Sequence, residues 1–278
     1  MLMSGEHSPR FLSLDRLLHP LLMGVCASLM GLEALAPHLP VVIAVLTLFS
    51  GTFVTYFLAT LTPSIDFNPP TRFSYKEAWW LLLISPVALT ILFLPEALII
   101  QYLGAGLIGF LYYIRVKTGQ FIFNGLRSFF LLKNIALSLA WSLATVSVDI
   151  MQGETINFFL YRFYFIMALS IAIDCRDMED DKKNGIPTIP LRTSFGFSCL
   201  LACMLMVAGY LTLISERHQS LDGHDLTVIA GITTAAAACS LVLIYVNRKK
   251  QFIRWVVDGN LLLHGIAFLT LHLNNGTN

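Results

Sequence analysis

The chain has 278 residues, of which 56% are hydrophobic and only 13% charged, and its formal net charge is +1. This composition excludes an ordinary water-soluble domain, in which roughly a quarter of the residues are charged. The near-neutral charge and the absence of basic stretches interleaved with aromatic residues argue against a nucleic-acid partner. The sequence therefore predicts a protein surrounded by membrane lipid.

Apolar runs long enough to cross a bilayer, roughly 20 residues each, recur along the chain. Because the runs are continuous and do not alternate with polar residues, they predict transmembrane helices instead of barrel strands. We find no low-complexity linker, so we expect a single transmembrane domain over residues 1–278. The predicted fold is an all-α polytopic bundle of nine transmembrane helices, at 18–36, 38–62, 76–95, 97–114, 129–150, 155–173, 195–215, 225–247 and 252–273.

Basic residues indicate how this bundle is oriented. With nine helices, 16 of the 18 Lys and Arg residues fall at the N-terminus or in the even-numbered connections, and the exceptions are Arg162 and Arg217. Basic residues accumulate on the cytoplasmic side of membrane proteins. The distribution therefore predicts an N-terminus and even connections in the cytoplasm, with the C-terminus outside.

Two groups of polar residues precede the acidic part of the chain. Asp66, Asn68 and Arg72 follow the second apolar run, where prolines end the helix, and on their own they are typical of a polar turn. Lys133 and Asn134 lie at the cytoplasmic end of the fifth run. Such a pair either extends to the membrane interface or points into a polar cavity.

Acidic residues cluster only at 174–181, directly after the sixth apolar run, where five of eight residues are carboxylates. The spacing of Asp174, Asp177 and Asp181 places all three on one face if the helix continues. Mg²⁺ prefers carboxylate oxygens and commonly bridges to substrate phosphates. Lys182 and the basic residues after it are placed to meet the charge of a diphosphate. The alternative is a solvated acidic–basic loop at the membrane edge.

Isolated polar residues inside the predicted helices have two interpretations. Glu33, Asp258 and Asn260 either hydrogen-bond to a neighbouring helix or face a cavity, because a polar or charged side chain that faces lipid is costly. His264 is expected to be a packing residue. Unpaired, buried thiols are expected at the five cysteines, Cys26, Cys175, Cys199, Cys203 and Cys239.

The stretch from Asp174 to Thr188 resembles the second aspartate-rich motif of the UbiA-type intramembrane prenyltransferases. That motif runs Asp-x-Arg-Asp-x-x-x-Asp, then Gly four residues later and Thr three residues beyond. Each of these positions is matched here, by Asp174, Arg176, Asp177, Asp181, Gly185 and Thr188.

A second part of the chain also resembles this superfamily. The series Lys133, Asn134, Trp141 and Thr145 is similar to one of the helices of its members. The superfamily has nine helices, with its two acidic motifs on the cytoplasmic side after the second and sixth helices. The resemblance thus covers nearly the whole chain and agrees with the topology predicted above.

The resemblance implies a reaction. Members of the superfamily bind an isoprenyl diphosphate through Mg²⁺, ionise it, and pass the allylic cation to a small acceptor, often aromatic or a quinone precursor. It thus implies a magnesium-dependent prenyltransferase of isoprenoid biosynthesis. Two alternatives stay open: a terpene cyclase of the same superfamily, in which the cation folds back on itself, and a non-catalytic protein that binds isoprenoids or lipids.

The resemblance also implies roles for individual residues. Asp174, Asp177 and Asp181 are expected to be catalytic. The expected magnesium ligands are Asp66, Asp174, Asp177 and Asp181. The expected substrate-binding residues are Asn68, Arg72, Lys133, Asn134, Arg176 and Lys182.

The first aspartate-rich motif departs from the pattern of the superfamily. The pattern Asn-Asp-x-x-Asp-x-x-x-Asp falls on residues 58–66, where Leu58, Ala59 and Thr62 replace the first three polar positions and only Asp66 remains. Leu and Ala side chains cannot bind a metal. Three outcomes are open: one Mg²⁺ suffices, Asp66 and Asn68 form a rearranged site, or the protein is not a catalyst.

Overall fold

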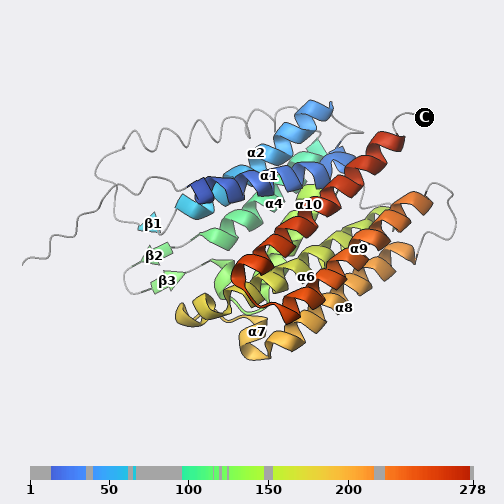
Figure 1. Ribbon diagram of the computed structural model, residues 1–278. Helices are drawn as coiled ribbons and strands as arrows, with labels where there is room; N and C mark the ends of the chain where they lie inside the picture. Colours follow the sequence, from blue (N-terminus) through green and yellow to red (C-terminus); the bar gives the residue numbers. More distant parts are fainter. Residues whose placement is uncertain are drawn as a thin grey trace, which may run out of the picture.

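The computed structural model describes residues 14–35, 40–61, 65–66, 96–114, 116–118, 121–123, 125–146, 153–215 and 223–275. These residues are mostly helical and form one bundle (Figure 1). Eight of the nine predicted spans correspond to a helix, and the other, 76–95, lies outside the described residues, so the predicted all-α bundle is confirmed. The helices are α1 (Leu14–Leu35), α2 (Val41–Leu61), α4 (Glu96–Tyr113), α5 (Leu132–Thr145), α6 (Gly153–Lys183), the short α7 (Ile189–Arg192), α8 (Phe195–Ile214), α9 (Gly223–Val246) and α10 (Lys250–Asn275).

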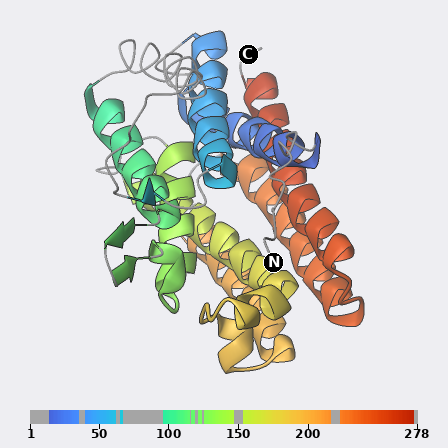
Figure 2. The ribbon, with the colours of Figure 1, turned by 90° about the vertical axis from the view of Figure 1, so that its left-hand side faces the viewer.

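A small sheet that the sequence did not predict lies beside α4. Its strands are β1 (Ile65–Asp66), β2 (Val116–Thr118) and β3 (Phe121–Phe123); β1 pairs parallel with β2, and β2 pairs antiparallel with β3. Figure 2 shows the sheet at one edge of the bundle. The 3₁₀ helix η1 (Leu126–Ser128) follows β3 in the chain. Strands of two or three residues are too short for an alternating pattern to reveal them.

The helices have the length and composition of a membrane protein. Among the described residues, three helical segments are long and apolar enough to cross a bilayer, Ile156–Lys183, Phe195–Ile214 and Thr227–Val246. Large apolar side chains also point outward, as Leu200 does on α8 and Ile232 does on α9, which are 57% and 62% exposed. An outer surface of this kind suits lipid and not water. The chain is an integral membrane protein.

Helix α6 continues well beyond the predicted apolar run. It has 31 residues, so it is about 46 Å long at 1.5 Å per residue, whereas the hydrocarbon core of a bilayer is about 30 Å thick. It ends where Gly185 takes a positive φ of 67°. Gly185 N donates to Lys182 O at 3.3 Å and Ile186 N to Asp181 O at 2.9 Å, the two bonds of a Schellman C-terminus. The whole acidic stretch is therefore helical, as its one-face spacing required.

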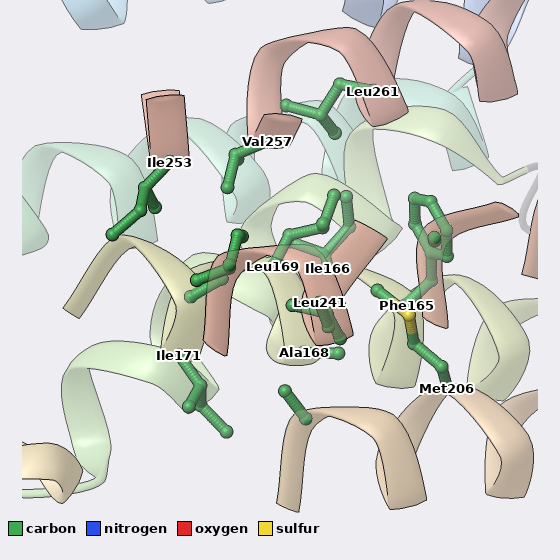
Figure 3. Close-up of a cluster of buried hydrophobic side chains, with 14 of the residues drawn as sticks. Phe165, Ile166, Ala168, Leu169, Ile171, Met206, Leu241, Ile253, Val257 and Leu261 are labelled. Atoms are coloured by element: carbon green, nitrogen blue, oxygen red, sulfur yellow. The ribbon is translucent and has the colours of Figure 1, made fainter. Parts of the chain in front are cut away.

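The main hydrophobic core is built around α6. Phe165, Ile166 and Leu169 of α6 are at most 4% exposed and belong to one buried cluster with Met206 of α8 and Leu241 of α9. Figure 3 shows these side chains together with Val257 and Leu261 of α10. The cluster holds α6 between α8, α9 and α10, so the carboxyl-terminal turns of α6 start from a rigid position.

Arg162 lies inside the bundle instead of at a membrane face. Its side chain is fully buried, its Nη2 donates to Met30 O of α1 at 3.0 Å, and its guanidinium carbon lies 4.9 Å from the centre of the Phe158 ring. Its assignment to the side opposite the other basic residues therefore carries no information on orientation. The residue connects α6 to α1.

The cysteines are free, as predicted, but they are not all buried. Cys26, Cys175 and Cys199 are buried, whereas Cys203 is half-buried and Cys239 is exposed. The expectation of burial was wrong for Cys239, because this position of α9 lies on the outer surface of the bundle.

Helix α5 is short, and its buried face is polar. Lys133, Asn134, Ser138, Ser142 and Thr145 are among its buried residues. The repeat of three or four residues places these side chains on one side of the helix, toward its neighbours. The polar face of α5 packs against α6 and forms one wall of the site described next.

Candidate functional site

Lys133 of α5 lies between two carboxylates of α6. Its Nζ is 2.7 Å from Asp174 Oδ1 and 3.4 Å from Asp181 Oδ2. The side chains of Lys133 and Asp174 are each 7% exposed, and that of Asp181 is 13% exposed. Asp174 and Asp181 are two helical turns apart and so share a face of α6. Of the two interpretations of Lys133, the one that points it into a polar cavity holds.

Asn134 supports the same carboxylate from the next position of α5. Its Nδ2 donates to Asp174 Oδ2 at 3.1 Å and to Ser170 Oγ at 2.9 Å. Ser170 is one turn before Asp174 on α6. Both oxygens of Asp174 are thus engaged, one by an ammonium and one by an amide. Asn134 Oδ1 is buried and accepts no hydrogen bond from the described residues.

Arg176 and Asp177 form a second ion pair, nearer to solvent. Arg176 Nε donates to Asp177 Oδ1 at 2.8 Å, and Nη2 donates to Oδ2 at 2.7 Å. This two-point geometry is the one a guanidinium prefers with a carboxylate. The two side chains are 24% and 33% exposed, so the pair is accessible to an incoming ligand.

These charged groups line one polar cavity of about 250 Å³. Asp258 of α10 and Arg127 of η1 also line it, so it is enclosed by segments far apart in the sequence. Asp258 Oδ2 lies 3.5 Å from Arg254 Nε, one turn earlier on α10. The charged residues of the lining are Arg127, Lys133, Asp174, Arg176, Asp177, Asp181 and Asp258.

A larger apolar cavity adjoins the polar one. It has a volume of about 390 Å³ and is lined by residues of α2, α4 and α5. Four residues line both cavities: Tyr56, Tyr112, Leu137 and Trp141. Trp141 Nε1 donates to Tyr56 OH at 3.1 Å, which joins α5 to α2 at this boundary. A ligand with a charged head and an apolar tail suits such a pair of cavities.

The other residues predicted for the site lie apart or outside the described chain. Asp66 belongs to β1, where it is in register with Lys117 of β2, and its side chain is not among those described. Asn68 and Arg72 lie outside the described residues. Lys182 is exposed and is not among the described residues that line the cavity. Of the predicted set, the structure thus brings together Lys133 and Asn134 of α5 with Asp174, Arg176, Asp177 and Asp181 of α6.

Sequence reasoning did not assign several of the lining residues to the site. Asp258 is a carboxylate inside a predicted span. The sequence did not show whether its side chain contacts a neighbouring helix or faces the cavity. Ser170 could have been predicted, because it precedes Asp174 by four residues and therefore lies on the same face of the helix. Arg127 and Tyr56 carry no sequence signal, since only the packing of η1 and α2 brings them to the cavity.

The oxygen donors of this cavity suit Mg²⁺ in kind, because carboxylates are the ligands that it prefers. Their arrangement, however, is not that of a preformed metal site. In the part of the chain that the structure describes, no three His, Cys, Asp or Glu side chains are grouped so that they could hold a metal ion. Each of the three α6 carboxylates that line the cavity is engaged by a basic side chain instead, Lys133 for Asp174 and Asp181 and Arg176 for Asp177.

Comparison with known proteins gives a likeness in structure only. No protein-family model matches the sequence, and no curated protein matches it. A solved digeranylgeranylglyceryl phosphate synthase is similar with a TM-score of 0.56 and 17% identity, over 93% of this chain and 96% of that one. A UbiA homolog from Archaeoglobus fulgidus with bound GPP and Mg²⁺ is similar with a TM-score of 0.57 and 15% identity, over 92% of this chain and 98% of that one. The same homolog with bound Cd²⁺ gives 0.58 and 16%, with the same coverage.

These similarities extend over nearly the whole of both chains, so they concern the complete bundle and not one helical hairpin. They agree with the resemblance seen in the acidic stretch. The chain has the UbiA-type fold.

Proposed function

We propose that this protein is a UbiA-type intramembrane prenyltransferase. In this proposal it binds an isoprenyl diphosphate, ionises it with Mg²⁺, and transfers the prenyl group to a small aromatic or quinone-type acceptor. Residues 1–278 act as one domain, with the N-terminus and the acidic end of α6 in the cytoplasm. The UbiA-type fold and the matched motif of α6 both support the proposal.

One observation carries the proposal. The carboxylates of Asp174, Asp177 and Asp181 line a polar cavity that shares a wall with a larger apolar cavity. An isoprenyl diphosphate has a compact, highly charged head and a long apolar tail. The charged head suits the polar cavity, and the apolar tail suits the apolar cavity.

The basic side chains of the polar cavity have a direct task in this reaction. Arg127, Lys133 and Arg176 line the cavity and would donate hydrogen bonds to the diphosphate, whose negative charge grows as the carbon–oxygen bond breaks. Bound Mg²⁺ would neutralise part of the same charge. Asp174, Asp177 and Asp181 would hold the ion, with Asp174 oriented by Asn134, whose amide also donates to Ser170.

The boundary between the two cavities is aromatic. Tyr56, Tyr112 and Trp141 lie where the head and the tail of the donor would meet, which is the position of the allylic carbon. Aromatic faces stabilise cations, so this wall would protect the allylic cation until an acceptor captures it. The same wall suits a cyclase, in which a double bond of the tail captures the cation.

Release of pyrophosphate from defined donors tests the proposal. Purified protein in detergent is mixed with geranyl, farnesyl or geranylgeranyl diphosphate, with and without Mg²⁺ and with and without aromatic and quinone-type acceptors, and the mass of the organic product is measured by mass spectrometry. We expect Mg²⁺-dependent release that Asp177→Ala reduces at least a hundredfold. A product that carries an acceptor identifies a transferase, whereas a hydrocarbon isomer identifies a cyclase. Binding of all three donors without release, with each acceptor class present and with or without Mg²⁺, contradicts both enzymes and leaves a binding protein.

A further inference from the structure

The polar cavity is nearly neutral without any metal ion. Its described lining includes three basic residues and four carboxylates, which gives a formal charge of −1. The buried members are paired directly: Lys133 contacts Asp174 at 2.7 Å and Asp181 at 3.4 Å. Buried charges persist only when they are paired in this way. The ammonium of Lys133 thus already provides the positive charge that these two carboxylates require.

A divalent cation and this ammonium compete for the same oxygens. A cation held by both Asp174 and Asp181 would lie between the oxygens that the ammonium of Lys133 contacts at 2.7 and 3.4 Å. Two positive charges so close together repel each other in a site that water screens poorly. Entry of the ion therefore requires that Lys133 leave Asp174.

A diphosphate gives Lys133 another partner. The ammonium is at the end of a flexible four-carbon side chain, which can turn from one anion to another within the same cavity. Arg176 can make the same exchange, from Asp177 to a phosphate, since its pair is partly open to solvent. Once the two basic side chains turn to the diphosphate, the carboxylates of Asp174, Asp177 and Asp181 would be available to hold the metal.

We infer that Lys133 takes the place of the divalent cation in the free protein, so that metal and diphosphate bind together and not independently. This inference rests on the proposed function for the identity of the diphosphate, but its metal part does not. It assigns Lys133 a second role as an internal counter-ion. It also accounts for a matched acidic motif whose carboxylates are not grouped as a metal site.

Mn²⁺ binding without any diphosphate tests the metal part. The purified protein is titrated with Mn²⁺, and free Mn²⁺ is measured by electron paramagnetic resonance, for wild type, Lys133→Met and Lys183→Met. Lys183 is the matched control because it is an exposed lysine at the end of α6. We expect Lys133→Met to bind Mn²⁺ at least about tenfold more tightly than wild type, the scale on which neighbouring groups change metal affinity. Equal or weaker binding by Lys133→Met, or the same gain in Lys183→Met, overturns the inference.

Thermal unfolding provides a second readout, which can be interpreted even if the variant is less stable than wild type. Lys133→Met is expected to melt at a lower temperature than wild type without metal, because Asp174 loses its partner. Since a ligand stabilises the state that binds it, Mn²⁺ is then expected to raise the melting temperature of Lys133→Met more than that of wild type. A shift no larger than that of wild type overturns the inference.

The joint binding of metal and diphosphate is tested on wild-type protein with Mg²⁺ and inorganic pyrophosphate. We expect the two together to raise the melting temperature by more than the sum of their separate effects. Strictly additive shifts overturn this part. If pyrophosphate has no effect under any condition, joint binding and the proposed function both fail, whereas a gain in Mn²⁺ affinity for Lys133→Met still establishes the counter-ion role.

Discussion

Lys133 of α5 and Asp174 of α6 form an ion pair of 2.7 Å in which each side chain is only 7% exposed. The pair lies where the polar cavity meets the core, and Asn134 occupies the second oxygen of Asp174 at 3.1 Å. It therefore has two consequences, one for the stability of the contact between α5 and α6 and one for the binding of ligands.

Removal of one partner is expected to destabilise the protein. Asp174→Asn keeps the shape of the side chain but leaves Lys133 with a longer contact to Asp181, and breaking a buried pair costs about 3–5 kcal/mol. We expect a clear decrease in the melting temperature in detergent. Asp180→Asn removes an exposed carboxylate of the same helix and should change stability by less than about 1 kcal/mol, because exposed charge interactions contribute little. Equal melting temperatures of the two variants would contradict the structural role of the pair.

The Arg176–Asp177 pair is expected to act on ligand binding more than on stability. Its side chains are 24% and 33% exposed, so its contribution to folding is below about 1 kcal/mol. Arg176→Lys loses the two-point contact that a guanidinium makes. We expect KM for an isoprenyl diphosphate to rise about tenfold, because a charged hydrogen bond contributes about 1.5–3 kcal/mol, with little change in melting temperature. Arg248→Lys, at an exposed arginine between α9 and α10, is the control, and an equal KM in both variants would show that Arg176 does not bind the diphosphate.

The apolar cavity is expected to determine which donor tails are accepted. Gly106 of α4 lines it, and a Cβ added there meets nothing within 4 Å, so a larger side chain would extend into open space. We expect Gly106→Leu to reduce kcat/KM for geranylgeranyl diphosphate about tenfold relative to geranyl diphosphate, the scale of a misfit of one or two carbons in an apolar pocket. Gly104 has equal space but is not among the residues that line the cavity. Gly104→Leu should leave the ratio unchanged; a change of the same size would refute the cavity as the tail site.

Gly185 is expected to matter through its backbone alone. Its φ is 67°, and an added Cβ meets nothing within 4 Å, so the effect of Gly185→Ala is the cost of a left-handed conformation, about 1–2 kcal/mol. Unfolding of the last turn of α6 would be visible as faster hydrogen exchange at 182–186. The same substitution at Gly104, inside α4, is expected to be neutral or stabilising. Unchanged exchange in Gly185→Ala would mean that the Schellman end does not hold Asp181 in place.

The elements of the fold were predictable because their signals are local. Continuous apolar runs of about 20 residues indicate helices without reference to any partner, and α8 and α9 follow their predicted runs closely. The one-face spacing of Asp174, Asp177 and Asp181 required only that α6 continue, and Gly185 marks its end. The short strands had no such signal, since Ile65–Asp66 pairs with a segment about 50 residues away.

The site itself was predictable only in part because it depends on packing. Lys133 and Asp174 were both identified, yet nothing in the sequence says that they contact each other across α5 and α6. Asp258 reaches the cavity because α10 packs against α6, a relation between segments almost 80 residues apart. The resemblance leads us to expect several carboxylates at 58–66, of which only Asp66 is present, and its side chain is not among those described.

The most direct test of the central claim compares two adjacent carboxylates of α6. Asp181 contacts Lys133 and lines the polar cavity, whereas Asp180 is exposed and is not among the residues that line it. Asp181→Asn and Asp180→Asn are assayed for Mg²⁺-dependent pyrophosphate release from the best donor, beside wild type and at matched protein stability. The account predicts that Asp181→Asn loses at least 99% of the wild-type rate and that Asp180→Asn keeps more than half. Equal rates in the two variants would contradict the claim that this face of α6 ionises the donor.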